Sequence, residues 1–64
     1  MFNKTMTNAD IKTVLSRQYS NSRRKSYQER LYDYNSGKKF IEMHMESYSD
    51  YDELVKFLID LLKI

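Results

Sequence analysis

The sequence has 64 residues, of which 41% are hydrophobic and 31% are charged, and this composition favours one folded domain over a disordered chain. Cysteine is absent and histidine occurs once, which excludes disulfide bonds and argues against a Cys/His zinc site, so we expect no metal and no cofactor. The net charge of +2 is unevenly distributed, because residues 1–30 hold seven basic and two acidic side chains, whereas residues 31–64 hold four basic and seven acidic.

The first predicted element is a helix over residues 8–19. Thr7 followed by Asp10 resembles a capping box, and apolar side chains then recur at helical spacing, at Ile11, Val14, Leu15 and Tyr19. Residues 1–6 precede this helix, and we expect them to form a flexible N-terminus of a single domain that spans residues 1–64. Residues 20–26 lack periodicity and predict a polar loop that carries the densest positive charge of the chain.

Two β-strands are predicted next, over residues 27–34 and 40–48, joined by a hairpin loop at residues 35–37. In the second strand Ile41, Met43 and Met45 alternate with polar residues, which is the period of a half-buried strand. Gly37 suits the positive φ that closes a three-residue hairpin loop. The implied register pairs Tyr34 with Lys38, Tyr32 with Phe40, Leu31 with Ile41, and Arg30 with Glu42.

The last predicted element is a helix with Ser49 as its N-cap and acidic residues in its first turn, where the helix dipole favours negative charge. From Leu54 to Ile64 the apolar positions cover a wide arc of this helix. This arc predicts either a core that wraps fully around the helix or self-association into a dimer through Phe57, Ile59 and Ile64. The predicted fold is therefore α+β, with the order helix, two-stranded antiparallel hairpin, helix.

The only cluster with catalytic side chains is His44 between Glu42 and Glu46 on one predicted strand face. A carboxylate beside a histidine tunes a general base, but this trio comes without a nucleophile or a glycine-rich phosphate loop. We interpret it as a solvated polar stripe and expect that the protein is not an enzyme.

Basic and aromatic residues form the stronger candidate site. Arginine pairs with phosphates and aromatic rings stack on unpaired bases, whereas Tyr and Arg also concentrate at the energetic centres of protein interfaces. Two functions therefore stay open, a protein-binding module and a small nucleic-acid-binding protein. The candidate binding residues are Arg17, Arg23, Arg24, Lys25, Arg30, Tyr27, Tyr32, Tyr34 and Phe40.

In size, composition and predicted element order, the chain resembles a broad class of short cysteine-free proteins from phages and mobile elements, which includes anti-CRISPR proteins and other inhibitors of host enzymes. The resemblance implies an inhibitor or regulator that binds a host protein or nucleoprotein and blocks it by steric occlusion. The basic segment Arg23-Arg24-Lys25 departs from the acidic DNA mimics of this class. No apolar run has the length of a membrane span and no signal-like segment is present, so we expect a cytoplasmic protein, in the host cell if it is phage-encoded.

Overall fold

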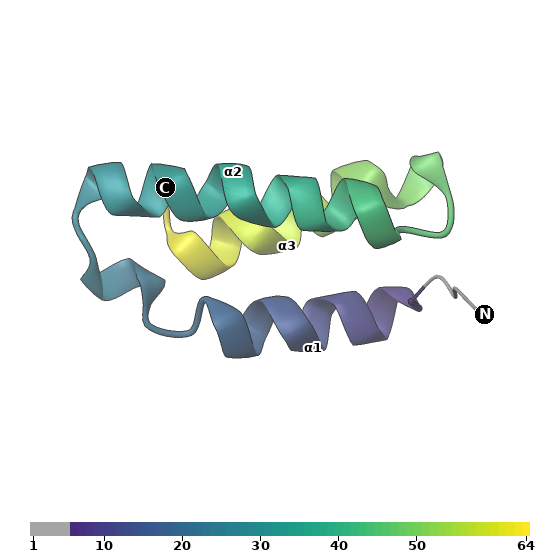
Figure 1. The fold of residues 1–64 in the computed structure, drawn as a ribbon, viewed down its shortest axis with the longest axis horizontal. Coiled ribbons are helices and arrows are strands. Elements are labelled where there is room, and N and C mark those ends of the chain that lie inside the picture. The colour runs from purple at the N-terminus through teal and green to yellow at the C-terminus, as the bar shows by residue number, and fades with distance from the viewer. Residues whose placement is uncertain (1–5) are drawn as a thin grey trace.

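The computed structural model describes residues 6–64, and these residues form a bundle of three α-helices with no strand. In chain order the elements are α1 (Asn8–Gln18), the 3₁₀ helix η1 (Ser22–Arg24), α2 (Tyr27–His44), the 3₁₀ helix η2 (Tyr48–Asp50) and α3 (Tyr51–Leu62). All three α-helices follow the long axis of a molecule that measures 38 × 22 × 16 Å, with α2 antiparallel to α1 and α3 (Figure 1). The α+β prediction with a β-hairpin is therefore wrong.

Helix α1 agrees with its prediction to within one residue. Its N-cap is Thr7, whose hydroxyl accepts a hydrogen bond from the backbone N–H of Asp10 at 3.1 Å. Its inward face presents Ile11 and Leu15, and Tyr19 continues this face just beyond the helix. All three are buried, and they belong to one core with Ile41, Leu54, Leu58 and Leu62.

Helix α2 replaces both predicted strands, and its start has a clear local cause. Ser26 and Glu29 form a capping box, in which the Ser26 hydroxyl accepts from the Glu29 N–H at 3.3 Å. The Glu29 carboxylate accepts in return from the Ser26 N–H at 3.2 Å, so two N–H groups that would otherwise be unsatisfied gain partners. The helix then continues without a break through residues 35–37, where the hairpin loop was predicted.

Gly37 lies in the interior of α2 and serves close packing rather than a turn. A Cβ atom at this position would lie 2.7 and 2.8 Å from the two methyl carbons of Leu58 and 3.3 Å from its Cγ. The missing side chain thus allows α2 to approach α3 at the point where the fully buried Leu58 meets it. The positive φ expected for Gly37 is not present.

The predicted strand alternation does not describe how α2 is buried. Ile41 is fully buried, but Met43, which was placed on the same face, is 70% exposed. The predicted cross-strand pairs are also wrong, although Tyr34 and Lys38 still meet as neighbours one helical turn apart. Lys38 Nζ lies 4.9 Å from the centroid of the Tyr34 ring.

Helix α3 begins at Tyr51, after η2, so the predicted N-cap at Ser49 is also wrong. Ser47 begins the 3₁₀ turn instead, and its hydroxyl accepts from the Ser49 N–H at 3.3 Å. The buried stripe of α3 is Leu54, Leu58 and Leu62, at the i, i+4, i+8 spacing of an amphipathic helix. This stripe contacts both α1 and α2, so α3 is the element that joins the bundle.

Part of the expected flexible N-terminus, residues 1–5, lies outside the described residues. Met6, the first described residue, donates its backbone N–H to the carbonyl of His44 at 3.4 Å and packs against the core. Among the helices of residues 6–64, none has the length and apolar character that crossing a membrane requires.

Candidate binding surface: a basic end and its groove

The antiparallel arrangement sorts charge along the long axis of the molecule. The last turn of α1, η1, the first turns of α2 and the C-terminus of α3 gather at one end (Figure 1). We call this the basic end, and its cations are Arg17, Arg23, Arg24, Lys25, Arg30 and Lys63. The opposite end holds η2 and the first turns of α1 and α3, and it carries Asp10, Glu42, Glu46, Asp50, Asp52 and Glu53.

The sequence already suggested a polarised molecule, but the fold changes where the poles lie. The two halves of the chain are not the two poles, because α3 runs back along α2 and brings Lys63 beside η1. Glu29, Asp33 and Asp60 offset part of the positive charge at the basic end. The potential of such an end extends about one Debye length, roughly 8–10 Å at moderate salt.

A buried polar contact holds η1 against α2. The Ser22 hydroxyl donates to Asp33 Oδ2 at 2.8 Å, and both side chains are buried. The Lys25 ammonium donates to the same carboxylate oxygen at 3.0 Å. Lys25 is therefore committed to the fold, while the neighbouring arginines of η1 are carried outward on a short, anchored turn.

Arg30 is also used internally. Its Nη1 donates to the backbone carbonyls of Lys63 at 2.8 Å and of Leu62 at 3.4 Å. These carbonyls belong to the end of α3, where the helix itself supplies no donors and carries the negative end of its dipole. Arg30 thus neutralises the C-terminus of α3, and its guanidinium also lies 5.8 Å from the ring centroid of Tyr27.

The exposed cations at the basic end, apart from the paired Lys25, are Arg17, Arg23, Arg24 and Lys63. Within residues 6–64, the ion pairs are Lys12–Glu53 and Lys25–Asp33, so none of the four exposed cations is paired with a carboxylate. Tyr27, which is 60% exposed, lies beside them in the first turn of α2. Of the predicted binding residues, those available to an external partner at this end are therefore Arg17, Arg23, Arg24 and Tyr27.

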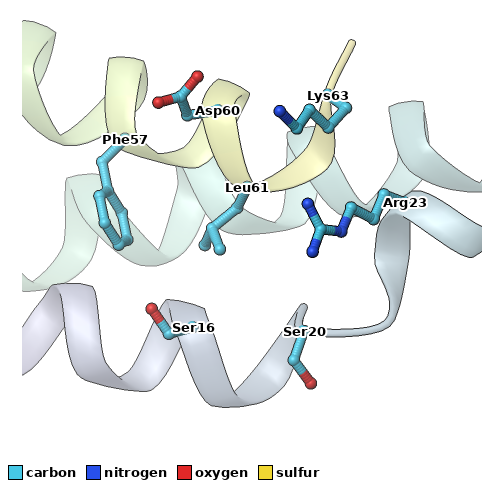
Figure 2. Close-up of a pocket in the computed structure, with 7 residues that line it drawn as sticks. All are labelled: Ser16, Ser20, Arg23, Phe57, Asp60, Leu61 and Lys63. Carbon is cyan, nitrogen blue, oxygen red and sulfur yellow. The ribbon is translucent and has the colours of Figure 1, made fainter.

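A groove between α1 and α3 opens at the basic end (Figure 2). Its volume is about 460 Å³. Phe57 and Leu61 project from α3 toward α1, and the Arg23 and Lys63 side chains reach in from the basic end (Figure 2). The remaining lining residues are Ser16, Ser20 and Asp60.

The predicted aromatic surface does not form, because it required a β-ribbon. Tyr32 lies on the outer face of α2 and is 74% exposed. Tyr34 and Phe40, by contrast, are partly buried and pack against the core. The three residues therefore do not share one binding face, and the aromatic group that the basic end retains is Tyr27.

Glu42, His44 and Glu46 do not share one face, because the strand on which they were predicted to alternate does not form. The His44 ring packs against Phe40 at a tilt of 36°, with ring centroids 4.4 Å apart, and its Nδ1 lies 3.0 Å from the Phe40 carbonyl oxygen. Glu42 points elsewhere and accepts from the Tyr51 hydroxyl at 3.4 Å. No group of three or more metal-ligating side chains occurs within residues 6–64.

At the end of the molecule opposite to the basic end, the pKa of Tyr51 lies above its ordinary value. Burial raises the pKa of Tyr51 above 10.0, and the negative charge and hydrogen bond of Glu42 raise it further. The Tyr51 ring stacks on Tyr48, with centroids 5.9 Å apart. These contacts join the C-terminal part of α2 to the start of α3.

The residues predicted for self-association fall on different sides of α3. Phe57 lines the groove toward α1, and Lys12 Nζ lies 5.6 Å from its ring centroid. Ile59 is half-buried, and Ile64, which is 36% exposed, lies beyond the helix at the basic end. They do not form one exposed apolar stripe, and dimer formation through them stays a prediction.

The sequence matches no family model, and neither the curated proteins nor the solved structures contain a significantly similar chain.

Sequence reasoning missed Lys63 and the groove. The spacing carried a signal, because Phe57 and Leu61 lie one helical turn apart on α3, and Ser16 on α1 and Ser20 just beyond it have the same four-residue spacing. Pairing these two faces requires knowing that α1 and α3 are neighbours. That follows only when residues 27–44 are recognised as one helix.

Proposed function

We propose that this protein is a non-enzymatic binding module whose basic end docks on an acidic surface of a protein or nucleoprotein partner. The observation that carries the proposal is the set of four exposed, unpaired cations within residues 6–64, Arg17, Arg23, Arg24 and Lys63, gathered from three elements. An anchored cluster of this kind steers an oppositely charged partner and fixes its orientation.

An inhibitory or regulatory role by steric occlusion, in the cytoplasm, is the form of this function that we propose. A domain of 7.8 kDa that docks by one end covers part of its partner's surface and leaves the rest of its own 38 Å length projecting from it. Such a projection obstructs whatever else must approach that surface. Support comes from the anchoring of η1, because the Ser22–Asp33 contact holds Arg23 and Arg24 in position before binding.

Nucleic-acid binding is the second candidate, and one observation favours it. Arg23 and Arg24 lie beside the exposed Tyr27, which combines phosphate-binding and base-stacking side chains on one end. The acidic opposite end limits such binding to a short contact. Nucleic-acid binding of this type weakens steeply with salt, with a slope set by the number of phosphates contacted.

The experiment that tests the proposal is affinity capture from host lysate with and without nuclease treatment. The bait is the wild-type protein, the double variant Arg23→Glu/Arg24→Glu, or the control double variant Lys39→Glu/Lys56→Glu. The control carries the same change of net charge on exposed positions in the middle of α2 and α3. We expect a protein that the wild type and the control retain after nuclease treatment and that the Arg23/Arg24 variant loses.

Two outcomes would contradict the proposal. Equal capture by the wild type and the Arg23/Arg24 variant would show that the basic end is not the docking surface. Capture that disappears on nuclease treatment, together with salt-sensitive binding of the purified protein to DNA or RNA, would favour the nucleic-acid function instead.

A further inference from the structure

We infer that the groove between α1 and α3 binds a short peptide segment of the partner protein, in which an apolar side chain stands next to a carboxylate. The inference rests on the proposed function and specifies the chemistry of the partner. It starts from the lining of the groove, whose apolar floor is Phe57 and Leu61 and whose cations are Arg23 and Lys63 (Figure 2).

The groove has room for a small part of a partner. Its volume of about 460 Å³ lies in the lower part of the range of roughly 300–1,000 Å³ that is typical of ligand sites. Phe57 and Leu61 are only partly buried, so an apolar side chain laid on them removes further apolar surface from water. This is the pattern of a peptide anchor residue and not of an extended flat interface.

The two cations at the groove form no ion pair in the described part of the chain, although Asp60 is among the lining residues. Neither Arg23 nor Lys63 forms an ion pair with any carboxylate of residues 6–64. The carbonyls at the end of α3, which would otherwise attract them, already accept from Arg30. A carboxylate of the partner would therefore be the first strong acceptor available to both side chains.

The cations and the apolar floor give the groove a direction. Arg23 and Lys63 reach in from the basic end, whereas Phe57 lies farther along α3, and the Asp60 carboxylate points away from α1 (Figure 2). The partner's carboxylate is therefore expected at the Arg23 and Lys63 end, with its apolar side chain on Phe57 and Leu61. Ser16 supplies a hydroxyl on the α1 side, which donates to or accepts from a peptide backbone, whereas the Ser20 hydroxyl points away from α3 (Figure 2).

A peptide fits this groove better than a nucleotide does. Base stacking needs an open aromatic face, but the Phe57 ring already has the Lys12 ammonium 5.6 Å from its centroid. The cations that line the groove, Arg23 and Lys63, also lie at one end of it, so they form no continuous positive track for a phosphate backbone (Figure 2). If nucleic acid binds this protein, we expect contacts at Arg24 and Tyr27, outside the groove.

The test selects ligands from a random heptapeptide library displayed on phage and then measures the selected peptides, fluorescein-labelled, by fluorescence polarisation. We expect the selected sequences to be enriched in a large apolar residue adjacent to Asp or Glu. Changing the selected acidic residue to Lys, within the same peptide, is expected to abolish measurable binding.

The matched variants are Arg23→Gln and Lys63→Gly in the groove, and Lys39→Gln as the control. Each groove variant is expected to weaken peptide binding by about three- to tenfold, as for a partly exposed charge contact. Lys39 is an exposed cation in the middle of α2 that neither lines the groove nor belongs to the basic end, so Lys39→Gln should leave the affinity unchanged. Lys63→Gly also guards against loss of folding, because glycine suits the left-handed backbone of this position.

Three results would overturn the inference, namely a library without binders, binders without acidic enrichment, or equal weakening by Lys39→Gln and Arg23→Gln. These failures are distinct from failure of the proposed function. If the captured partner is lost with Arg23→Glu/Arg24→Glu but, once purified, binds Lys63→Gly with the same affinity as the wild type, the basic end docks the partner and the groove does not hold a peptide. If neither variant affects capture, both proposals fail.

Discussion

Replacing Gly37 by alanine tests the contact between α2 and α3 directly. Two opposing effects contribute. In an exposed helix interior, alanine is favoured over glycine by about 1 kcal/mol. At Gly37, however, the new Cβ would lie 2.7 and 2.8 Å from the Leu58 methyl carbons, and Leu58 is fully buried, so it has no solvent-facing space to move into. Overpacking of this kind costs about 1–3 kcal/mol. We therefore expect Gly37→Ala to lower the free energy of unfolding by about 1 kcal/mol net.

The test that distinguishes packing from backbone conformation repeats Gly37→Ala after the Leu58 side chain has been shortened. In a Leu58→Ala background, the clash disappears and Gly37→Ala fills part of the cavity, so the same substitution should now stabilise the protein by about 1 kcal/mol. Comparing Asn35→Ala with Asn35→Gly at an exposed position of α2 measures the helix preference alone. If residues 35–37 formed a hairpin loop with Gly37 at positive φ, alanine would be unfavourable in both backgrounds.

The assay is urea denaturation followed by circular dichroism. Leu58→Ala alone is expected to cost about 2–5 kcal/mol, a large fraction of a small domain's stability. All variants are therefore measured in the same concentration of a stabilising osmolyte, trimethylamine N-oxide. The difference in the free energy of unfolding between Asn35→Ala and Asn35→Gly gives the helix preference for alanine. If Gly37→Ala stabilised the otherwise wild-type protein by that same amount, the packing argument would be refuted.

Three further predictions follow from single contacts. Lys63→Gly is expected to raise the free energy of unfolding, measured in urea, by about 1 kcal/mol. The reason is that Lys63 follows α3 with a φ of 59°, where a Cβ is unfavourable. An unchanged free energy of unfolding would contradict this. Asp33→Ala should lower the free energy of unfolding by about 2 kcal/mol in the same assay, since it leaves the buried Ser22 hydroxyl unpaired. Lys25→Ala should lower it by less than about 1 kcal/mol, because this ion pair is partly exposed. Equal costs of the two substitutions would argue against the buried contact. The raised pKa of Tyr51 means that the folded state holds the phenol proton more tightly than the unfolded state, so this contribution to stability is present below pH 10 and is lost as pH rises through the raised value. Carbon NMR of the Tyr51 ring should show its titration midpoint moving down in Glu42→Gln, and an unchanged midpoint would exclude Glu42 as a cause.

Some of the fold was predictable because its signals are local. The first helix was predicted correctly from the Thr7 cap and the spacing of Ile11 and Leu15. The wide apolar arc of residues 54–64 likewise identified a C-terminal helix, although its start lies after η2 and not at Ser49. Where the pattern of buried residues is apolar and periodic, sequence alone locates the helix.

Helix α2 was missed because its inward face is not apolar. The buried positions of α2 are Asp33, Gly37 and Ile41, which have the four-residue spacing of a helix but include one carboxylate and one glycine. The exposed Met43 then imitated strand alternation beside Ile41. The local signal that would have corrected this was Ser26-x-x-Glu29, the capping box that begins the helix.

The candidate site was predictable only in part, for a related reason. The density of charge at Arg23 and Arg24 is visible in the sequence. The internal roles of Lys25 and Arg30 are not, because their partners, Asp33 and the end of α3, lie 8 and 33 residues away along the chain. From the sequence alone, a cation that is free to bind a partner cannot be distinguished from a cation that caps a distant helix. The distinction requires knowing how the helices pack.

The most direct test of the account is the affinity of the captured partner for three proteins, measured by isothermal titration calorimetry at two salt concentrations. These are the wild type, Arg23→Glu/Arg24→Glu and Lys39→Glu/Lys56→Glu. We predict a loss of tenfold or more for the Arg23/Arg24 variant, about 1.4 kcal/mol or more, with a weaker salt dependence than the wild type. The Lys39/Lys56 variant should stay within about threefold of the wild type, since its changes lie away from the basic end. Equal losses in the two variants would contradict a docking surface at the basic end, because net charge alone would then explain the binding.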